Sequence, residues 1–193
     1  MRSFIYLVLF VILLQLQSCA TLSEAECKRG NWYDIGLRDG ARGRSITHYN
    51  KHIEACSKYA VRFQQRPYQK GYQQGLRSYC THSSGFKQGN AINEYYDVCR
   101  GPSEREFLGG YIEGLKTAEH EINADLYDAR RERNHIEDDI HSTSNEKDKT
   151  NLNSELDSIE REIERLRDKQ DTLHDYLHRY HSHSQRPTLL QTN

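Results

Sequence analysis

The chain has 193 residues, of which 35% are hydrophobic and 28% are charged, and its formal net charge at pH 7 is −1. This composition excludes a large compact core. Residues 28–100 hold thirteen Lys or Arg against five Asp or Glu, whereas residues 101–193 hold thirteen against twenty-one, so the charge is strongly bipolar. The basic half suits an anionic lipid surface, where each basic residue contributes on the order of 1 kcal/mol, and it suits an ordinary solvated surface equally well.

An unbroken apolar run from Phe4 to Leu14 follows Arg2 at the start of the chain. A helix of this length would span about 16 Å, roughly half the hydrocarbon thickness of a bilayer, which argues against a stable membrane span. A basic start, a short apolar region and small residues after it are typical of a secretory signal. Together with the cysteine at position 19, the pattern predicts a lipoprotein signal peptide over residues 1–18.

Residues 16–19, Leu-Gln-Ser-Cys, resemble the bacterial lipoprotein box, in which a peptidase cuts before the cysteine and its sulfur carries a diacylglycerol. We therefore expect Cys19 to be lipidated and residues 19–26 to form the lipidated N-terminus and a short spacer. A thiolate is the side chain nucleophilic enough for this step. Ala20 resembles the outer-membrane sorting pattern, so the expected location is the outer membrane, facing the periplasm. An ordinary signal peptide cleaved elsewhere is the alternative.

Four cysteines remain when Cys19 is set aside: Cys27, Cys56, Cys80 and Cys99. An even set in an oxidising compartment predicts two disulfides. Three pairings are possible, and we favour Cys27 with Cys56 and Cys80 with Cys99 because each closes a local loop. A zinc site is the alternative, although the chain has no Cys-x-x-Cys pair.

Short helices are expected between the anchor and residue 99. The spacing of Ser23 and Glu26 predicts a capping box that opens the first helix. Further helices are expected over residues 32–42, 47–59, 67–80 and 85–98, with starts marked by Asn31, by Pro67 and by Ser83 with Ser84. No alternating pattern is long enough to predict a sheet.

A Gly-x-x-x-Gly motif occurs four times, at residues 36–40, 71–75, 85–89 and 110–114. A glycine inside a helix costs about 1 kcal/mol relative to alanine, so the motif needs a compensating role. Glycines spaced by four share one helix face and let another backbone approach closely. The motifs therefore predict a tightly crossed helical domain over residues 27–115. The alternative is that a ligand or glycan approaches the backbone there while tyrosines stack on it.

This domain resembles an uncharacterised family of small envelope lipoproteins of Gram-negative bacteria, known as a domain of unknown function with repeated aromatic-x-x-Gly motifs. The resemblance implies a helical lipoprotein and no known activity. The residues that carry it are Trp32, Tyr33, Gly36, Asp39, Gly40, His52, Cys56, Tyr68, Gly71, Gly75, Leu76, Tyr79, Cys80, Gly85, Phe86, Gly89, Tyr96, Val98, Cys99, Phe107, Gly110 and Tyr111.

Apolar residues recur in steps of three and four from Leu108 to Ile140 and again from Leu152 to Tyr180, with a polar run over residues 141–151 between them. Ser103 and Glu106 have the spacing of another capping box. The twelve residues from Ile140 to Leu152 break the heptad, so the chain is expected to turn there. A continuous rod that pairs with a second copy is the alternative.

The sequence therefore predicts an all-α protein. A small disulfide-stapled helical domain is followed by a long antiparallel coiled-coil hairpin over residues 116–181 and a disordered tail over residues 182–193.

Two histidine groups have helical spacing that suits a metal ion such as zinc. His174, His178 and His181 share one stripe, and His48, His52 and Cys56 share another. Solvated helix histidines are the alternative, and a disulfide is the preferred role of Cys56. Asp34 and Asp39 are expected to be a helix cap and a surface acid. No catalytic motif is present, so an enzyme is not expected.

The expected function is therefore a non-enzymatic structural or protein-interaction role for a lipid-anchored envelope protein. The coiled coil would bind a protein partner or a second copy. The alternatives are a binding module for an anionic lipid or a cell-wall polymer, and metal binding by histidines. No cofactor is expected besides the lipid on Cys19, and export excludes nucleic acid as a partner.

Overall fold

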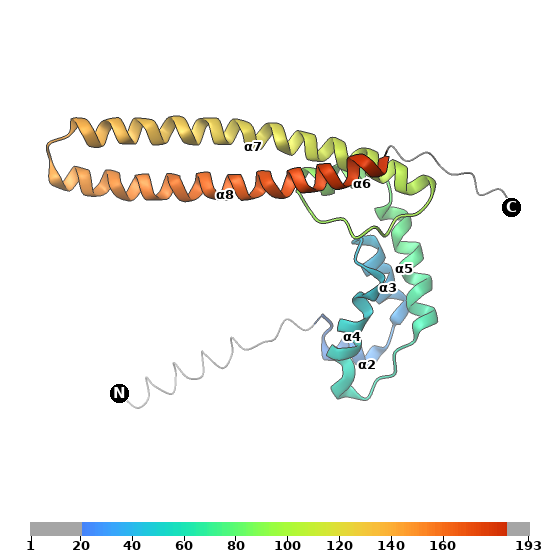
Figure 1. Ribbon diagram of the computed structural model, residues 1–193. Helices are drawn as coiled ribbons and strands as arrows, with labels where there is room; N and C mark the ends of the chain where they lie inside the picture. The colour runs from blue at the N-terminus through green and yellow to red at the C-terminus, as the bar shows by residue number, and fades with distance from the viewer. Residues whose placement is uncertain (1–20, 185–193) are drawn as a thin grey trace, which may run out of the picture. The chain divides into compact units, whose positions relative to one another are not determined.

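The computed structural model describes residues 21–184, and every regular element in that range is helical, which confirms the all-α prediction (Figure 1). The described chain divides into two compact units, one ending at Arg77 and the other beginning at Ser78. The predicted boundary near residue 115 does not coincide with this division. One continuous helix, α7, contributes to a glycine-containing helix pair and to the hairpin, so no boundary falls between them. The predicted signal peptide, Cys19 and residues 185–193 lie outside the described residues.

The first unit contains α2 (Glu24–Arg29), α3 (Trp32–Ala41), the 3-10 helix η1 (Ile46–His48), α4 (Tyr49–Cys56), η2 (Ser57–Tyr59) and α5 (Gln65–Tyr79), whose last two residues count with the second unit. The predicted capping box of Ser23 and Glu26 opens α2. The side chain of Asn31 caps α3 as predicted. The helix predicted over residues 47–59 is instead three consecutive short helices.

The second unit contains α6 (His82–Asn90), α7 (Pro102–Ser142) and α8 (Glu146–Ser184). The prediction of a helix from 85 to 98 with serine caps is wrong. The hydroxyl of Thr81 accepts from the Ser84 N–H at 3.2 Å, so α6 begins earlier. It ends earlier as well, because Ile92 takes a left-handed conformation and the Asn93 N–H bonds back to the Gln88 carbonyl at 3.0 Å.

The predicted capping box of Ser103 and Glu106 is also wrong. Gly101 is the N-cap of α7, with φ 61° and no side-chain capping bond, and Pro102 is the first helical residue. The Ser103 hydroxyl instead donates to the Arg100 carbonyl at 3.0 Å. A proline at the first position suits a helix start because its missing N–H would have no helical partner there.

The glycine motifs form two reciprocal helix pairs, α3 with α5 and α6 with α7. A Cβ on Gly36 would collide with the Tyr68 carbonyl, and a Cβ on Gly71 would collide with the Tyr33 carbonyl. The predicted close approach of backbones is therefore confirmed. The alternative that a ligand approaches these glycines is wrong, because the partner helix already fills the space.

The two pairs repeat one design. Gly85 and Gly110 meet the carbonyls of Phe107 and His82, at the positions where Gly36 and Gly71 meet theirs. The hydrogen bonds repeat too. The Tyr72 hydroxyl donates to the Arg44 carbonyl and the Tyr111 hydroxyl to the Asn93 carbonyl, both at 2.7 Å and both four residues past a motif's second glycine. The chain thus contains an internal structural repeat that sequence reasoning recognised only as a recurring motif.

One disulfide belongs to each unit. Cys27 pairs with Cys56, and Cys80 pairs with Cys99, which is the pairing that the sequence favours. Each bond joins the segment before the first helix of a glycine pair to the segment before the second. Loops closed over 29 and 19 residues contribute about 3 kcal/mol each in the chain-entropy account. The bonds therefore clamp each helix pair near its start.

Helices α7 and α8 lie antiparallel and form the predicted hairpin, joined by residues 143–145 (Figure 1). The amide of Gln170 donates to Asn123 at 2.7 Å, beside the predicted partner Ile122. The loop is much shorter than the predicted polar run, and α8 continues to Ser184, beyond the predicted start of the tail at residue 182. None of the helices within residues 21–184 combines the length and apolar character of a membrane span.

Candidate functional site

Asp39 and His52 are the buried polar or charged residues of the part of the chain that the structure describes, with exposed fractions of 4% and 3%. Asp39 lies on α3 and His52 on α4. The Nε2–H of His52 donates to Oδ2 of Asp39 at 2.7 Å. A buried carboxylate is costly unless it is paired and hydrogen-bonded, so this pair is a specific arrangement that the rest of the fold must support.

Two further hydroxyl groups complete the network. The Tyr68 hydroxyl, from α5, donates to the same oxygen of Asp39 at 2.8 Å. The Thr21 hydroxyl lies 2.8 Å from Nδ1 of His52 and also donates to the Lys51 carbonyl at 3.1 Å. Leu22 is buried beside it. The beginning of the described chain is therefore held against the same cluster that α3, α4 and α5 build.

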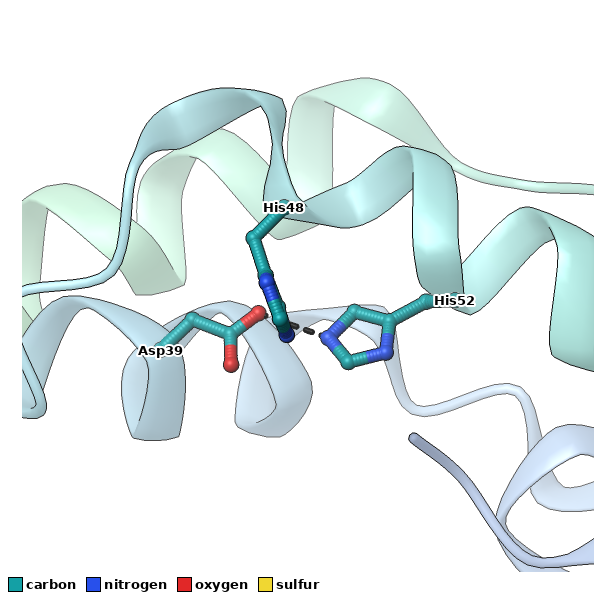
Figure 2. A group of neighbouring side chains, drawn as sticks. All are labelled: Asp39, His48 and His52. Carbon is teal, nitrogen blue, oxygen red and sulfur yellow. Dashed lines mark hydrogen bonds and ion pairs between the residues drawn. The ribbon is translucent and has the colours of Figure 1, made fainter. Parts of the chain in front are cut away.

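His48 lies at the edge of the cluster, four residues before His52, and the two rings meet edge to face with centroids 4.9 Å apart (Figure 2). The Arg44 guanidinium donates from Nη1 to Nε2 of His48 at 2.9 Å. Its Nε lies 3.8 Å from Oδ1 of Asp39. Arg44 thus places a positive charge between the outer histidine and the buried carboxylate.

The environment sets the protonation of these groups. Burial raises the pKa of the Asp39 carboxyl, but hydrogen bonds from His52 and Tyr68 outweigh it, so that pKa lies below its ordinary value. Burial and the neighbouring Arg44 charge lower the pKa of His48. Burial and the bond to Asp39 raise the pKa of Tyr68. At neutral pH the site therefore holds a carboxylate, a neutral His48 and a protonated phenol.

A cavity of about 90 Å³ adjoins the cluster. It is large enough for a small ion or a few water molecules. Arg38 is among its lining residues, but its guanidinium pairs with Glu26 at 2.7 Å. The lining residues are Thr21, Leu22, Ile35, Arg38, Asp39, Arg42, Arg44, His48 and His52.

The second unit shows that the fold does not require this cluster. The position of Asp39, just before the second glycine of its motif, is occupied there by Gln88. The position of Tyr68, three residues before a glycine, is occupied by Phe107. The same close helix crossing forms in both units. The buried acid, histidine and phenol are therefore specific to the first unit and are not needed for the helix crossing.

Sequence reasoning identified part of this site. His48 and His52 do lie together, but Cys56 is bonded to Cys27 and is not a ligand. The expectation that Asp39 is a surface acid is wrong, because α4 and α5 cover it. Asp34 is not itself the cap of α3: it is the third helical residue, and its N–H donates to the side chain of the N-cap residue Asn31. No sequence period relates Asp39 to His48, so only the tertiary fold reveals the cluster.

The histidine stripe near the C-terminus has a different setting. The side chains of His174 and His178 are exposed, and Nε2 of His174 lies 3.2 Å from a Glu119 oxygen. The side chain of His181 lies outside the described residues. Metal binding by His174, His178 and His181 therefore stays a prediction.

These features define a class: a small, disulfide-bonded, all-helical protein with two glycine-packed helix pairs and a coiled-coil hairpin. Residues 31–116 match the family described as protein of unknown function (DUF2799). No curated protein is significantly similar to the chain, and no solved structure is. The matched range contains the glycine contacts of both helix pairs and the Asp39–His52–Tyr68 network, whereas the rest of α7 and all of α8 lie outside it. The network is thus part of the matched domain.

Proposed function

We propose that the protein is a lipid-anchored, non-enzymatic envelope protein that faces the periplasm from the outer membrane and holds a protein partner through its hairpin. The lipid on Cys19 would hold the first unit at the bilayer surface. The hairpin of α7 and α8 would supply the partner-binding surface.

The start of the described chain supports the anchoring role. Thr21 and Leu22 are fixed on the first unit by hydrogen bonds and burial. Thr21 follows Cys19 by two positions, and two positions of extended chain reach at most about 7 Å. Residues 21–77 hold eleven Lys or Arg against five Asp or Glu, a balance of +6. A lipid on Cys19 would therefore keep a basic unit at an anionic surface without a long flexible spacer.

The observation that carries the partner-binding role is the length of hairpin that the second unit does not use for its own packing. Helix α6 lies against the first turns of α7, and the Tyr180 hydroxyl reaches the Tyr95 carbonyl at 2.8 Å. Residues 126–163 lie beyond this region, where α7 and α8 run alongside each other (Figure 1). A structural domain alone would not need this extension.

The chemistry of this outer hairpin, residues 126–163, favours a basic protein surface as its partner. It holds eleven Asp or Glu against six Lys or Arg, a balance of −5. Tyr127 is 68% exposed on it. Exposed aromatic side chains within a charged surface are typical anchors of protein interfaces.

Shortening the hairpin tests the proposal. Deleting residues 127–140 together with 152–165 removes two heptads from each helix and retains the turn. Crosslinked partners in cells should be lost, while the disulfides and the membrane fraction stay unchanged. A photoreactive residue at Tyr127 should capture the partner, and one at the exposed Tyr96 of the same unit is the matched control. An unchanged set of crosslinks after shortening would contradict the proposal.

A second candidate function, binding of an anionic lipid or cell-wall polymer, is favoured by the +6 balance of the first unit. The chain with Cys19→Ser should then bind phosphatidylglycerol vesicles at low salt and release them at high salt. Charge reversal at the exposed residues Lys51, Lys58 and Lys70 should weaken this binding. Reversal of three basic residues of the outer hairpin is the control. Equal binding by both variants would exclude this candidate.

A further inference from the structure

We propose that Asp39, His48 and His52 form a binding site for a divalent transition-metal ion of the zinc class on the first unit. The proposal depends neither on lipidation of Cys19 nor on a partner of the hairpin. The site shares His48 and His52 with one of the two histidine stripes of the sequence, but Asp39 takes the place of Cys56. It shares no residue with the stripe near the C-terminus.

The ligand atoms lie near the spacing that one ion requires, and small side-chain movements would complete it. One atom from each of the three side chains lies within 4.8 Å of the others. Zinc binds nitrogen and oxygen ligands at about 2.0–2.2 Å, so two ligands of one ion lie roughly 3–4 Å apart. Figure 2 shows the three side chains converging from α3 and from the η1–α4 segment. His52 and Asp39, now 2.7 Å apart, need only separate by about half an ångström as the shared proton leaves.

The neighbours of the ligands have the arrangement that metal sites use to orient their ligands. The Thr21 hydroxyl lies 2.8 Å from Nδ1 of His52, the nitrogen that faces away from Asp39. The Tyr68 hydroxyl donates to the Asp39 carboxylate at 2.8 Å. Such outer contacts fix the ring and the carboxylate and so reduce the cost of binding. The second unit, which has Phe107 in place of Tyr68, has no counterpart of this support.

Arg44 is the competing cation. Its guanidinium donates to Nε2 of His48 at 2.9 Å, so that nitrogen carries a lone pair that a metal ion could take over from Arg44. The Arg44 side chain is 41% exposed, and it can turn into solvent when a metal ion replaces its charge. Of the other arginines at the cavity, Arg38 is neutralised by Glu26 and Arg42 is exposed. The site therefore exchanges one cation for another.

The donor set selects the kind of metal. Two imidazoles and one carboxylate suit zinc and its neighbours, whereas calcium and magnesium prefer oxygen ligands. Three protein ligands leave a coordination position open. The cavity of about 90 Å³ beside the three residues has room for a water molecule there.

Zinc titration of the full-length chain, purified in detergent, tests the proposal by competition with a chromophoric chelator. One zinc ion per chain should bind, and His48→Gln should weaken it by about tenfold or more. Arg44→Gln should tighten binding, because it removes the competing charge. His82→Gln, at an exposed histidine of the second unit, is the matched control and should bind as the unaltered chain does.

His48 is only half buried, so its substitution should leave the helical circular dichroism unchanged and the comparison valid. A chain that binds no zinc saturably, or a His48→Gln variant that binds it as tightly as before, would overturn the proposal. Loss of binding on substitution of His174 and His178 instead would place the metal on the hairpin and overturn it as well. No tightening with Arg44→Gln would refute the exchange of cations.

Discussion

Two adjacent glycines on α7 should respond to alanine in opposite directions. Gly109 is exposed, and a Cβ there would meet the His82 ring at 3.7 Å, an ordinary contact. A Cβ on Gly110 would lie closer than 3.0 Å to backbone atoms of His82 and Phe86 on α6. The two positions share one helix interior, so the same intrinsic gain in helix propensity applies to both.

The magnitudes follow from these contacts. Gly109→Ala should stabilise the second unit by about 0.5–1 kcal/mol, because alanine favours the helix more than glycine does. Gly110→Ala has the same gain but forces α6 and α7 apart, and overpacking against a rigid backbone costs about 3 kcal/mol, the upper end of the usual range. The net loss of stability should therefore be about 2–3 kcal/mol. Gly71→Ala, at the equivalent position of the first unit, should behave as Gly110→Ala does.

Chemical unfolding followed by circular dichroism measures the stability of each variant, and hydrogen exchange of the α6 amides assigns the change to the second unit. Gly109→Ala should raise the unfolding midpoint and Gly110→Ala should lower it. A shift of the same sign and size for both would refute the close backbone contact of α6 and α7.

Three further predictions concern other contacts. Hydrogen bonds from the capping serine and from Arg38 hold the pKa of Glu26 at about 2 against an ordinary value of 4.5, a contribution present above pH 4.5 and lost as the pH falls toward 2. Glu26→Gln should therefore lower the free energy of unfolding by about 1–2 kcal/mol at neutral pH, a value reduced to allow for the exposure of the side chain. The difference in stability between the variant and the unaltered chain should shrink in unfolding curves at acid pH, and a difference that does not depend on pH would contradict this. Tyr68→Phe should preserve the fold but lower the stability by about 1–2 kcal/mol, because buried Asp39 no longer accepts a hydrogen bond from the phenol. Loss of the disulfide or of helicity would contradict this limited role of Tyr68. Nε of Arg133 is buried in the hairpin and lacks a hydrogen bond, and its nearest charge is a half-exposed Glu137 oxygen at 3.6 Å. Since leucine restores the apolar heptad position and a partly exposed ion pair contributes little, Arg133→Leu should raise the thermal midpoint by a few degrees, and a lower midpoint would contradict an apolar contact of α7 with α8 there.

The elements that local chemistry specifies were predictable from the sequence. Each of these signals acts over one or two helical turns. The signals are the Ser23 capping box, the Asn31 cap and the heptads of the hairpin. The hairpin turn followed from the interrupted heptad. The length of the loop could not be predicted, because the first turns of α8 consist of polar residues that show no apolar period.

The features that depend on tertiary contacts were less accessible. Gly-x-x-x-Gly spacing predicts a close helix contact but not which helix provides the partner. The end of α6 depends on the left-handed backbone of Ile92 and on burial of Tyr95, which β-branched and aromatic side chains do not signal by themselves. Asp39 resembles any helix acid in the sequence, and only the contacts of α4 and α5 make it a buried carboxylate.

The internal repeat distinguishes the contacts that both units share from the residues that differ between them. Both units use the same glycine contacts and the same tyrosine-to-carbonyl bond, so these features explain how the helix pairs form. Within residues 21–184, a carboxylate and histidines meet at the corresponding position in the first unit and not in the second. The hairpin adds a surface that neither pair requires. The residues that pack the helix pairs are thus distinct from the residues to which we assign a function.

Intact mass spectrometry of the mature protein from bacterial membranes tests the central claim most directly. The account predicts that the N-terminal peptide begins at Cys19 and carries a diacylglyceryl thioether and a fatty-acyl amide. A mature chain that begins at another residue, or an unmodified sulfur at position 19, would contradict it.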